Sequence, residues 1–266
     1  MMFRCPVCRE PLQRQEKQYR CKSGHSFDIA RSGYVNLLLD NGRGRHGDDK
    51  KMVAARSAFL EKGFYRPLCD KTVELCVQYA VEGGVLADCG CGECYYTAAV
   101  AQQVPMQVYG IDISKAALAA GARRSRMLWL AVASSKALPF ADAGVDIVLN
   151  LFSPLQAEEF YRVLKPGGIL IRAIPLERHL MQLKCRIYEK PYENKPENRN
   201  IPGFSLLEER AVQYEFFLKS NEDIRNLFQM TPYYYKTGRN DQAKLAGLNE
   251  LTCTAAFGLL AYRRNL

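Results

Sequence analysis

The sequence lacks any run of 18 consecutive apolar residues, any long tract of one residue type and any internal repeat. A membrane-spanning helix needs about 20 apolar residues, so a transmembrane protein is excluded. The first residues also lack the cationic region and apolar run of a secretory signal, which predicts a cytoplasmic protein with no membrane partner. In that reducing compartment the ten cysteines are expected to be thiols or metal ligands.

The composition is that of a folded globular protein. Hydrophobic residues make up 48% and charged residues 24% of the 266 positions, which is typical of soluble domains and not of disordered chains. The net charge of +9 is concentrated at one end, because residues 1–66 hold 14 Lys and Arg against 7 Asp and Glu. Such a field suits a phosphate backbone, although an ordinary solvated surface explains it equally well.

Four metal-ligating residues stand near the start of the chain. Cys5 and Cys8 form Cys-x2-Cys, and after 12 residues Cys21 and His25 form Cys-x3-His. Three thiolates and one imidazole match a tetrahedral zinc ion, and four protein ligands leave no open position, so the zinc is expected to be structural. The spacing predicts a zinc-binding RNA-recognition module over residues 1–38 whose folding depends on the metal.

Basic and aromatic residues alternate around these ligands. They are Arg4, Arg9, Arg14, Lys17, Arg20, Lys22 and Arg31, with Phe3, Tyr19, Phe27 and Tyr34 between them. The mixture suits looped or single-stranded RNA, because bases stack on aromatic rings while cations meet phosphates. Some of the aromatic rings must fill the small core instead, and Phe27 is the first candidate for that role.

The rest of the chain divides into a connecting region at 39–80 and an α/β domain at 81–266. Residues 40–49 are rich in glycine and charge, which predicts a mobile loop, and helical apolar spacing follows at 52–62 and 68–79. From residue 85 apolar runs alternate with helical stretches, the pattern of a doubly wound parallel sheet. Strands are expected at 85–89, 107–112, 128–133, 146–152 and 169–174, with a final pair around 213–218 and 256–263. Helices are expected at 95–103, 115–124, 156–164 and 179–188, and a loop at 191–202.

A glycine-containing loop follows the first of these strands. Gly90 and Gly92 stand where the backbone must turn sharply and approach a ligand closely. Asp88 lies two residues before the first glycine, and Asp112 ends the next strand, where a carboxylate can bridge two ribose hydroxyls. The pattern predicts a cofactor-binding loop.

Two cofactors compete for this loop. NAD rests its pyrophosphate on a helix amino terminus, where Glu93 would repel it, and it usually requires a third glycine. S-adenosylmethionine carries no phosphate but has an ammonium and a sulfonium, for which Asp88 is a suitable neighbour. The residues therefore favour S-adenosylmethionine, with NAD as the alternative. Cys91 and Cys94 also form Cys-x-x-Cys, and we favour small-residue packing over a redox pair or a second metal site because no histidine or further cysteine pair is near.

Two later strand ends complete the expected crevice. Ser134 and Leu138 follow the third strand, where folds of this kind frame the adenine, and are candidate cofactor contacts. Asn150 and Phe152 end the fourth strand, and the carboxyl ends of strands line the ligand crevice in an open α/β sheet. Both are candidate catalytic residues, with core packing an equal alternative for Phe152.

A second aromatic run, Met-Thr-Pro-Tyr-Tyr-Tyr at 230–235, is the other candidate wall for a base. A packed strand edge explains it equally well. No residue identifies itself as a general base, and for His179 a cofactor contact is favoured over that role.

Several segments together resemble one family. They are the zinc ligands and residues 27–38, 55–60, 88–93, 110–115, 138–140, 164–168, 179–180 and 229–232. Over nearly its full length the sequence resembles the bacterial 23S ribosomal RNA (guanine-N1)-methyltransferases, and residues 46–52 are closer to the Gram-positive branch. The resemblance implies methyl transfer from S-adenosylmethionine to N1 of a hairpin-loop guanine in 23S ribosomal RNA.

The resemblance also implies site residues and a partner. It implies cofactor contacts from Tyr65, Gly92, Glu93, Asp112 and His179, and a homodimer whose two zinc modules frame one RNA cleft. Cys94 departs from the family, which has a third glycine there, and its Cβ would lower cofactor affinity if the position needs a positive φ. The alternatives are a small-molecule methyltransferase with a structural zinc lid, and an RNA-binding protein without catalysis.

Overall fold

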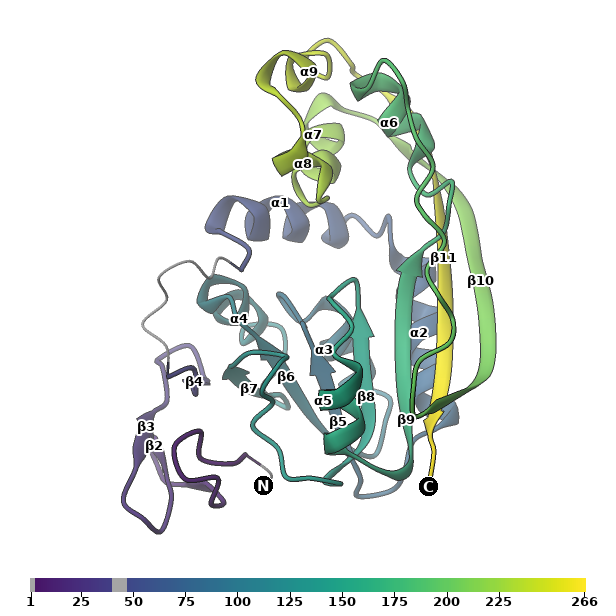
Figure 1. The fold of residues 1–266 in the computed structure, drawn as a ribbon. Helices are drawn as coiled ribbons and strands as arrows, with labels where there is room; N and C mark the ends of the chain where they lie inside the picture. The colour runs from purple at the N-terminus through teal and green to yellow at the C-terminus, as the bar shows by residue number, and fades with distance from the viewer. Residues whose placement is uncertain (1–2, 40–46) are drawn as a thin grey trace.

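A mixed eight-stranded sheet forms the centre of the computed structural model, which describes residues 3–39 and 47–266. Its strand order is β10-β11-β9-β8-β5-β6-β7-β4 (Figure 1). The strands are β4 (Tyr34–Asn36), β5 (Val85–Cys89), β6 (Gln107–Asp112), β7 (Trp129–Val132), β8 (Val145–Leu151), β9 (Leu164–Pro175), β10 (Phe204–Leu218) and β11 (Leu251–Arg264). The predicted α/β fold class is confirmed, and every strand expected after residue 81 is present.

The direction of the strands defines one functional edge. The strands from β4 to β9 run parallel, whereas β11 and β10 run antiparallel to their neighbours. From β5 the chain steps to β6 and β7 on one side, and later to β8 and β9 on the other. An open α/β sheet binds its ligand at such a reversal, outside the carboxyl ends of the strands. The crevice is therefore expected above β5 and β8.

Helices cover both faces of the sheet, with α2 (Arg66–Gln78), α3 (Tyr95–Ala101) and α4 (Lys115–Gly121) packed into one apolar cluster and α5 (Ala157–Val163) into the other. The other helices lie at or beyond the carboxyl edge of the sheet (Figure 1), and they are α1 (Lys50–Glu61), α6 (Met181–Ile187), α7 (Asn221–Gln229), α8 (Tyr233–Lys236) and α9 (Arg239–Ala243). Within β5, Leu86 packs into one apolar cluster while Ala87 and Cys89 pack into the other. Burial on both faces explains why the strands read as continuous apolar runs.

The zinc module docks on this sheet. Its own small sheet comprises β1 (Gln13–Arg14), β2 (Gln18–Arg20) and β3 (Ser26–Asp28), whereas β4 joins the main sheet beside β7. Phe3 is 1% exposed, and its ring lies 5.1 Å from Tyr109 and 5.9 Å from Phe140. Phe27 packs against this core as expected but is only half-buried, whereas the fully buried rings are those of Phe3 and Tyr19. Their burial removes these two rings from base stacking.

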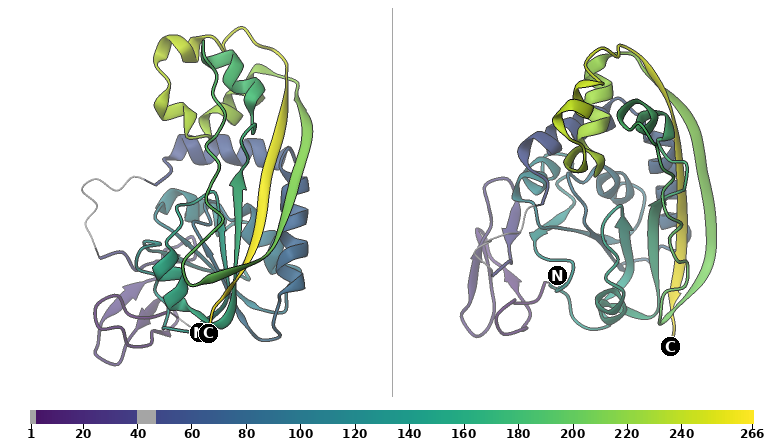
Figure 2. Two further views of the ribbon diagram at one scale, coloured as in Figure 1. Left: turned by 45° about the vertical axis from the view of Figure 1, so that its right-hand side comes forward. Right: turned by 45° about the horizontal axis from the view of Figure 1, so that its top comes forward.

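A helical cap, α6 to α9, stands beyond the carboxyl edge of the sheet. The final strands are longer than expected, and β10 and β11 rise past the other strands to carry this cap above α1 (Figures 1 and 2). Helices α7 to α9 were not predicted, and the 230–235 run lies at the end of α7 and in α8, so the strand-edge interpretation is wrong. Lys62 after α1 donates to Asp223 of α7 at 2.5 Å, which ties the cap to the domain.

Part of the connecting region lies outside the described residues. This applies to positions 40–46 of the predicted loop, and so to the start of the segment that resembles the Gram-positive branch. Within 3–39 and 47–266, no helix has the length and apolar character to span a bilayer.

Candidate active site and zinc centre

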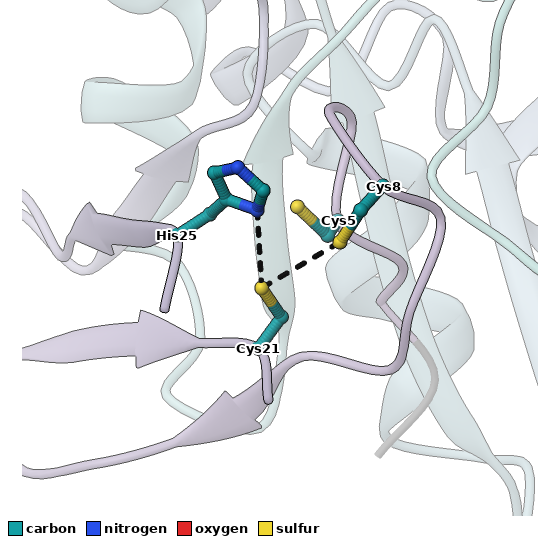
Figure 3. A group of neighbouring side chains, drawn as sticks. All are labelled: Cys5, Cys8, Cys21 and His25. Atoms are coloured by element: carbon teal, nitrogen blue, oxygen red, sulfur yellow. Dashed lines mark hydrogen bonds between the residues drawn. The ribbon is translucent and has the colours of Figure 1, made fainter. Parts of the chain in front are cut away.

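The four predicted zinc ligands converge from two tight turns of the amino-terminal module (Figure 3). Their ligand atoms all lie within 4.8 Å of one another. Cys8 Sγ is 3.6 Å from Cys21 Sγ, and Cys21 Sγ is 3.3 Å from His25 Nδ1. A tetrahedral zinc with Zn–S bonds of about 2.3 Å separates two thiolates by about 3.8 Å. The donor set and spacing fit zinc, and four protein ligands make the site a closed one.

Glu10 links the two turns and was not identified from the sequence. Its Oε2 accepts hydrogen bonds from the Ser23 amide and the Ser23 hydroxyl, each at 2.9 Å. These two bonds are the first causes of the lowered pKa of Glu10. The carboxylate therefore holds one ligand turn against the other while lying outside the ligand set.

The cofactor loop has the backbone that its glycines predict. Gly90 has φ +96° and Gly92 φ +54°. A Cβ built on Gly90 would lie 2.5 Å from Ser153 Cβ, so a side chain there would collide with the loop after β8. The Gly92 amide donates to Asp112 Oδ2 at 2.8 Å, which fixes the loop against the end of β6.

Asp112 lies where a ribose-binding carboxylate is expected. Its second oxygen, Oδ1, accepts from the Ser114 amide at 2.8 Å. Burial raises the pKa of Asp112, while these two amide bonds act in the opposite direction. Both oxygens keep lone pairs for hydroxyl donors, so the geometry fits the predicted contact.

Asp88 on β5 has an incomplete set of partners. It is 2% exposed, and Oδ2 accepts from Thr97 Oγ1 at 2.6 Å. Across residues 3–39 and 47–266, Oδ1 finds no hydrogen-bond partner. Burial raises the pKa of Asp88 to about 7. An unpartnered buried carboxylate oxygen favours a cationic or N–H-bearing ligand, as the ammonium of S-adenosylmethionine would provide.

Glu93 and Cys94 begin the helix after the loop. Glu93 is buried and accepts from Arg124 Nη2 at 2.8 Å, so one of its oxygens is committed to an ion pair. Cys94 has φ +62°, which is the left-handed conformation that the third glycine of the family would adopt freely. Its Sγ lies 3.8 Å from Cys91 Sγ, and burial raises the pKa of the Cys91 thiol well above its usual value. A buried protonated thiol is unreactive, which supports packing over redox chemistry.

Tyr65, which precedes α2, and His179, which follows β9, are buried and in contact with each other. Tyr65 Oη is 3.5 Å from His179 Nε2, and His179 Nδ1 accepts from the Ala256 amide at 3.2 Å. Because Nδ1 is an acceptor, the ring proton resides on Nε2. Burial and the nearby Lys184 charge lower the pKa of His179 to about 3. The imidazole is therefore neutral at physiological pH and a weak base.

Phe152 is the exposed aromatic ring at the carboxyl end of β8. It is 47% exposed and has φ +56°, an uncommon conformation for an aromatic residue. Its ring centre lies 6.4 Å from Tyr96 and 5.3 Å from Phe257. Phe257 in turn lies 4.4 Å from His179. Backbone strain of this kind is concentrated at functional sites, so the exposure and conformation favour a ligand-facing ring over core packing.

Asn150 is buried near the end of β8, two residues before Phe152. Its Nδ2 donates to Ser153 Oγ, and its Oδ1 accepts from Arg172 Nε at 3.1 Å. Ser153 Oγ also donates to the Cys89 carbonyl at 2.6 Å. Through Ser153, Asn150 therefore fixes the loop that carries Phe152 against the cofactor loop.

The two predicted adenine contacts differ in their surroundings. Ser134 is half-buried after β7, and its Oγ accepts from the Lys136 amide at 3.2 Å. Leu138 is fully buried in the core, and its amide donates to Glu159 Oε1 at 2.5 Å. Ser134 therefore lies just beyond the carboxyl end of β7, whereas the Leu138 side chain is enclosed in the core.

Comparison with known proteins identifies both parts of the chain. Residues 3–39 match the family described as RlmA, N-terminal, a zinc ribbon, and residues 87–172 match the methyltransferase domain family. A Micromonospora griseorubida protein that carries the name 23S rRNA (guanine-N(1)-)-methyltransferase is 35% identical over 98% of this chain and 97% of its own length. The chain belongs to this methyltransferase family.

One further relative and one solved structure are also similar to this chain. The 23S rRNA (guanine(748)-N(1))-methyltransferase of Streptomyces fradiae is 36% identical over 68% of this chain and 66% of its own length. Phosphoethanolamine N-methyltransferase 2 of Haemonchus contortus, solved with S-adenosyl-L-methionine, is 14% identical with a TM-score of 0.50, covering 82% of this chain and 58% of that one. This last likeness concerns the fold alone.

The family and the site give the cofactors. This (guanine-N1)-methyltransferase family member is an S-adenosylmethionine-dependent enzyme with a structural zinc ion. The fit of the donor rests on the unpartnered Asp88 oxygen and on the glycine cradle that a Cβ at Gly90 would fill. The individual contacts expected from Tyr65, Glu93 and His179 stay predictions.

Proposed function

We propose that this enzyme transfers the methyl group of S-adenosylmethionine to N1 of a guanine in a hairpin loop of 23S ribosomal RNA. The observation that carries the proposal is the 35% identity that extends over 98% of the chain, through the zinc ribbon as well as the catalytic domain. A cofactor loop by itself is shared by many methyltransferases. Guanine 748, the position in the name of the Streptomyces fradiae relative, is the first nucleotide to examine.

The chemistry requires an extruded base. Guanine N1 carries a proton and lies on the Watson–Crick edge, so the base must be unpaired or flipped before it can react. When bound, the donor supplies an electrophilic methyl group on a sulfonium. Asp88, Asp112 and the Gly90 loop would hold the donor so that N1 gains the methyl group as the S–C bond breaks, with S-adenosylhomocysteine as the leaving group and the N1 proton passing to water. Most of the acceleration comes from positioning N1 and the methyl carbon in contact.

We assign the base platform to Phe152. Its ring is 47% exposed at the carboxyl end of β8, beside the loop that carries Gly90. Asn150 and Ser153 hold this segment through the bonds described above, so they position the platform without touching the base. Stacking of a base on an aromatic ring contributes about 1–3 kcal/mol. Phe152→Ala is therefore expected to raise the KM for RNA by about 10- to 100-fold.

The zinc module supplies the RNA grip in this proposal. Six of its basic residues are exposed, namely Arg9, Arg14, Lys17, Arg20, Lys22 and Arg31. Arg20→Glu with Lys22→Glu is expected to weaken RNA binding and to leave donor binding unchanged. Lys71→Glu, an exposed charge reversal on α2, is the matched control. If the module variant and the control variant bind RNA with equal affinity, the zinc module does not bind the RNA through these two residues.

Two further features of the proposal come from the family. We propose that the enzyme acts in the cytoplasm as a homodimer, with two zinc modules framing one RNA cleft. Sedimentation of the zinc-loaded protein is expected to give twice the 30.1 kDa chain mass. A monomer that retains full activity would contradict the shared cleft.

The activity itself is tested with purified enzyme and radiolabelled donor. Unmodified 23S ribosomal RNA is expected to accept label on guanine N1, and the Phe152→Ala variant is expected to need about 10- to 100-fold more RNA for the same rate while still binding donor. Label on a small acceptor with none on RNA would favour the small-molecule alternative.

A further inference from the structure

Arg56 on α1 places a positive charge at the cofactor loop. A Cβ built on Gly92 would lie 3.5 Å from Arg56 Nη1, so the guanidinium lies directly over the loop backbone. Burial raises the pKa of Asp112 and of Glu93, and the Arg56 charge acts in the opposite direction on both. Arg56 therefore brings positive charge to a loop flanked by carboxylates, in addition to Arg124, which is bound to Glu93.

The position of Arg56 is fixed by the segment before α1. Asp48 pairs with Arg56 through Oδ2 and Nη1, and the Asp48 carbonyl accepts from Ser114 Oγ at 2.7 Å. A Cβ built on Gly47 would lie 2.8 Å from Ile113 Cγ2, so this segment packs against the residues after β6. Helix α1 is thus anchored across the carboxyl edge of the sheet, where it lies in Figure 1.

The pair with Asp48 leaves Arg56 available to a ligand. Their side chains are 25% and 23% exposed, and an ion pair with this access to water contributes at most about 1 kcal/mol. The neighbouring Arg124 differs, because it is bound to Glu93 at 2.8 Å and to Glu61 at 2.6 Å. A ligand carboxylate could therefore replace Asp48 as the partner of Arg56 at a small cost in free energy.

S-adenosylmethionine carries such a carboxylate. Its sulfonium and ammonium suit the acidic side of the loop, whereas its carboxylate would be repelled by Asp88 and Asp112 and needs a cation. We propose that Arg56 binds the carboxylate of the methionine moiety of the methyl donor. A guanidinium presents paired N–H donors that match a carboxylate in geometry. The inference rests on the proposed function in one respect, the identity of the donor.

Two ligands that differ in the amino acid moiety test the inference. S-adenosylhomocysteine keeps the carboxylate, whereas 5′-methylthioadenosine has the nucleoside and thioether alone. Calorimetry with the zinc-loaded full chain is expected to show Arg56→Gln losing about 10- to 100-fold in affinity for S-adenosylhomocysteine. Its affinity for 5′-methylthioadenosine is expected to stay within about twofold of the unsubstituted protein, since no contact to the nucleoside is removed.

Two further variants separate binding from folding. Lys50→Gln, an exposed charge removal on the same helix, is expected to bind both ligands normally. Asp48→Asn breaks the ion pair but keeps Arg56, so it is expected to retain affinity for S-adenosylhomocysteine. The inference is overturned if Arg56→Gln weakens both ligands equally or neither, or if Asp48→Asn loses as much as Arg56→Gln. Failure of the unsubstituted protein to bind either ligand would instead overturn the proposed function.

Discussion

Cys94 and Gly121 form a reciprocal contact between α3 and α4 that can be measured. Cys94 is fully buried with φ +62°, where a residue other than glycine costs about 1–2 kcal/mol. A Cβ built on Gly121 would lie 2.5 Å from Cys94 Sγ and 3.1 Å from Cys94 Cβ. The thiol thus occupies the space that a methyl group on Gly121 would need.

The structure gives the expected size of the coupling. Gly121→Ala alone overpacks this contact at a cost of about 1–3 kcal/mol, against a gain of about 1 kcal/mol in helix propensity. In the Cys94→Gly background the obstructing Sγ and Cβ are gone and only the Glu93 carbonyl carbon, at 3.1 Å, still crowds the added Cβ, so the same substitution is expected to stabilise the protein by at most about 1 kcal/mol. The two substitutions are therefore expected to couple by about 1–3 kcal/mol in the favourable direction.

Urea unfolding of the four proteins measures this coupling. The zinc-loaded, reduced proteins are compared without donor, so that ligand binding does not contribute to the free energy of unfolding. If the changes in the free energy of unfolding of the two single variants add up to that of the double variant within about 0.5 kcal/mol, Cys94 and Gly121 do not share this space. The Cys94→Gly protein also tests the departure from the family, because its affinity for S-adenosylmethionine should equal or exceed that of the unsubstituted chain.

Three other predictions concern the acids of the crevice and the zinc. Asp88 has its pKa raised by burial to about 7, above the unfolded value of about 3.9, so it stabilises the native state when protonated and this contribution is lost as pH rises from about 4 to 7. Asp88→Asn should remove that dependence from urea titrations, and a stability difference that does not change with pH would contradict the assignment. Asp112→Ala should weaken donor binding by about 1–3 kcal/mol in calorimetry, and an unchanged affinity would exclude Asp112 from the ribose. Chelation should unfold the zinc module before the main domain and destabilise the sheet, because Phe3 is buried against Tyr109. A single unaltered melting transition would refute the zinc assignment.

Local signals in the sequence were sufficient for the elements that bind cofactor and metal. β5 and β6 begin and end as predicted at 85–89 and 107–112, because both are apolar runs closed by a carboxylate or a glycine turn. The zinc ligands followed from spacing alone, since four short-range ligands leave few arrangements. These features depend on residues that are close together in the sequence, so they can be predicted from local patterns.

Contacts between segments that lie far apart in the sequence could not be predicted from local patterns. Helix α7 has a polar capping residue, Ser220, whose Oγ accepts from the Asp223 amide, but nothing in the sequence indicated that α7 would pack over α1. Arg56 was part of a recognised motif, yet its place over Gly92 depends on how α1 crosses the sheet. The positive φ of Phe152 likewise depends on Ser153 binding the Cys89 carbonyl, 64 positions earlier.

Methylation of the cellular RNA tests the central claim most directly. Fragments of 23S ribosomal RNA from cells with and without this gene are compared by mass mapping. One hairpin-loop guanine is expected to carry an added methyl group on N1 only when the gene is present, restored by the unsubstituted gene and less completely by Phe152→Ala. Identical methylation in both strains, at every guanine of that RNA, would contradict it.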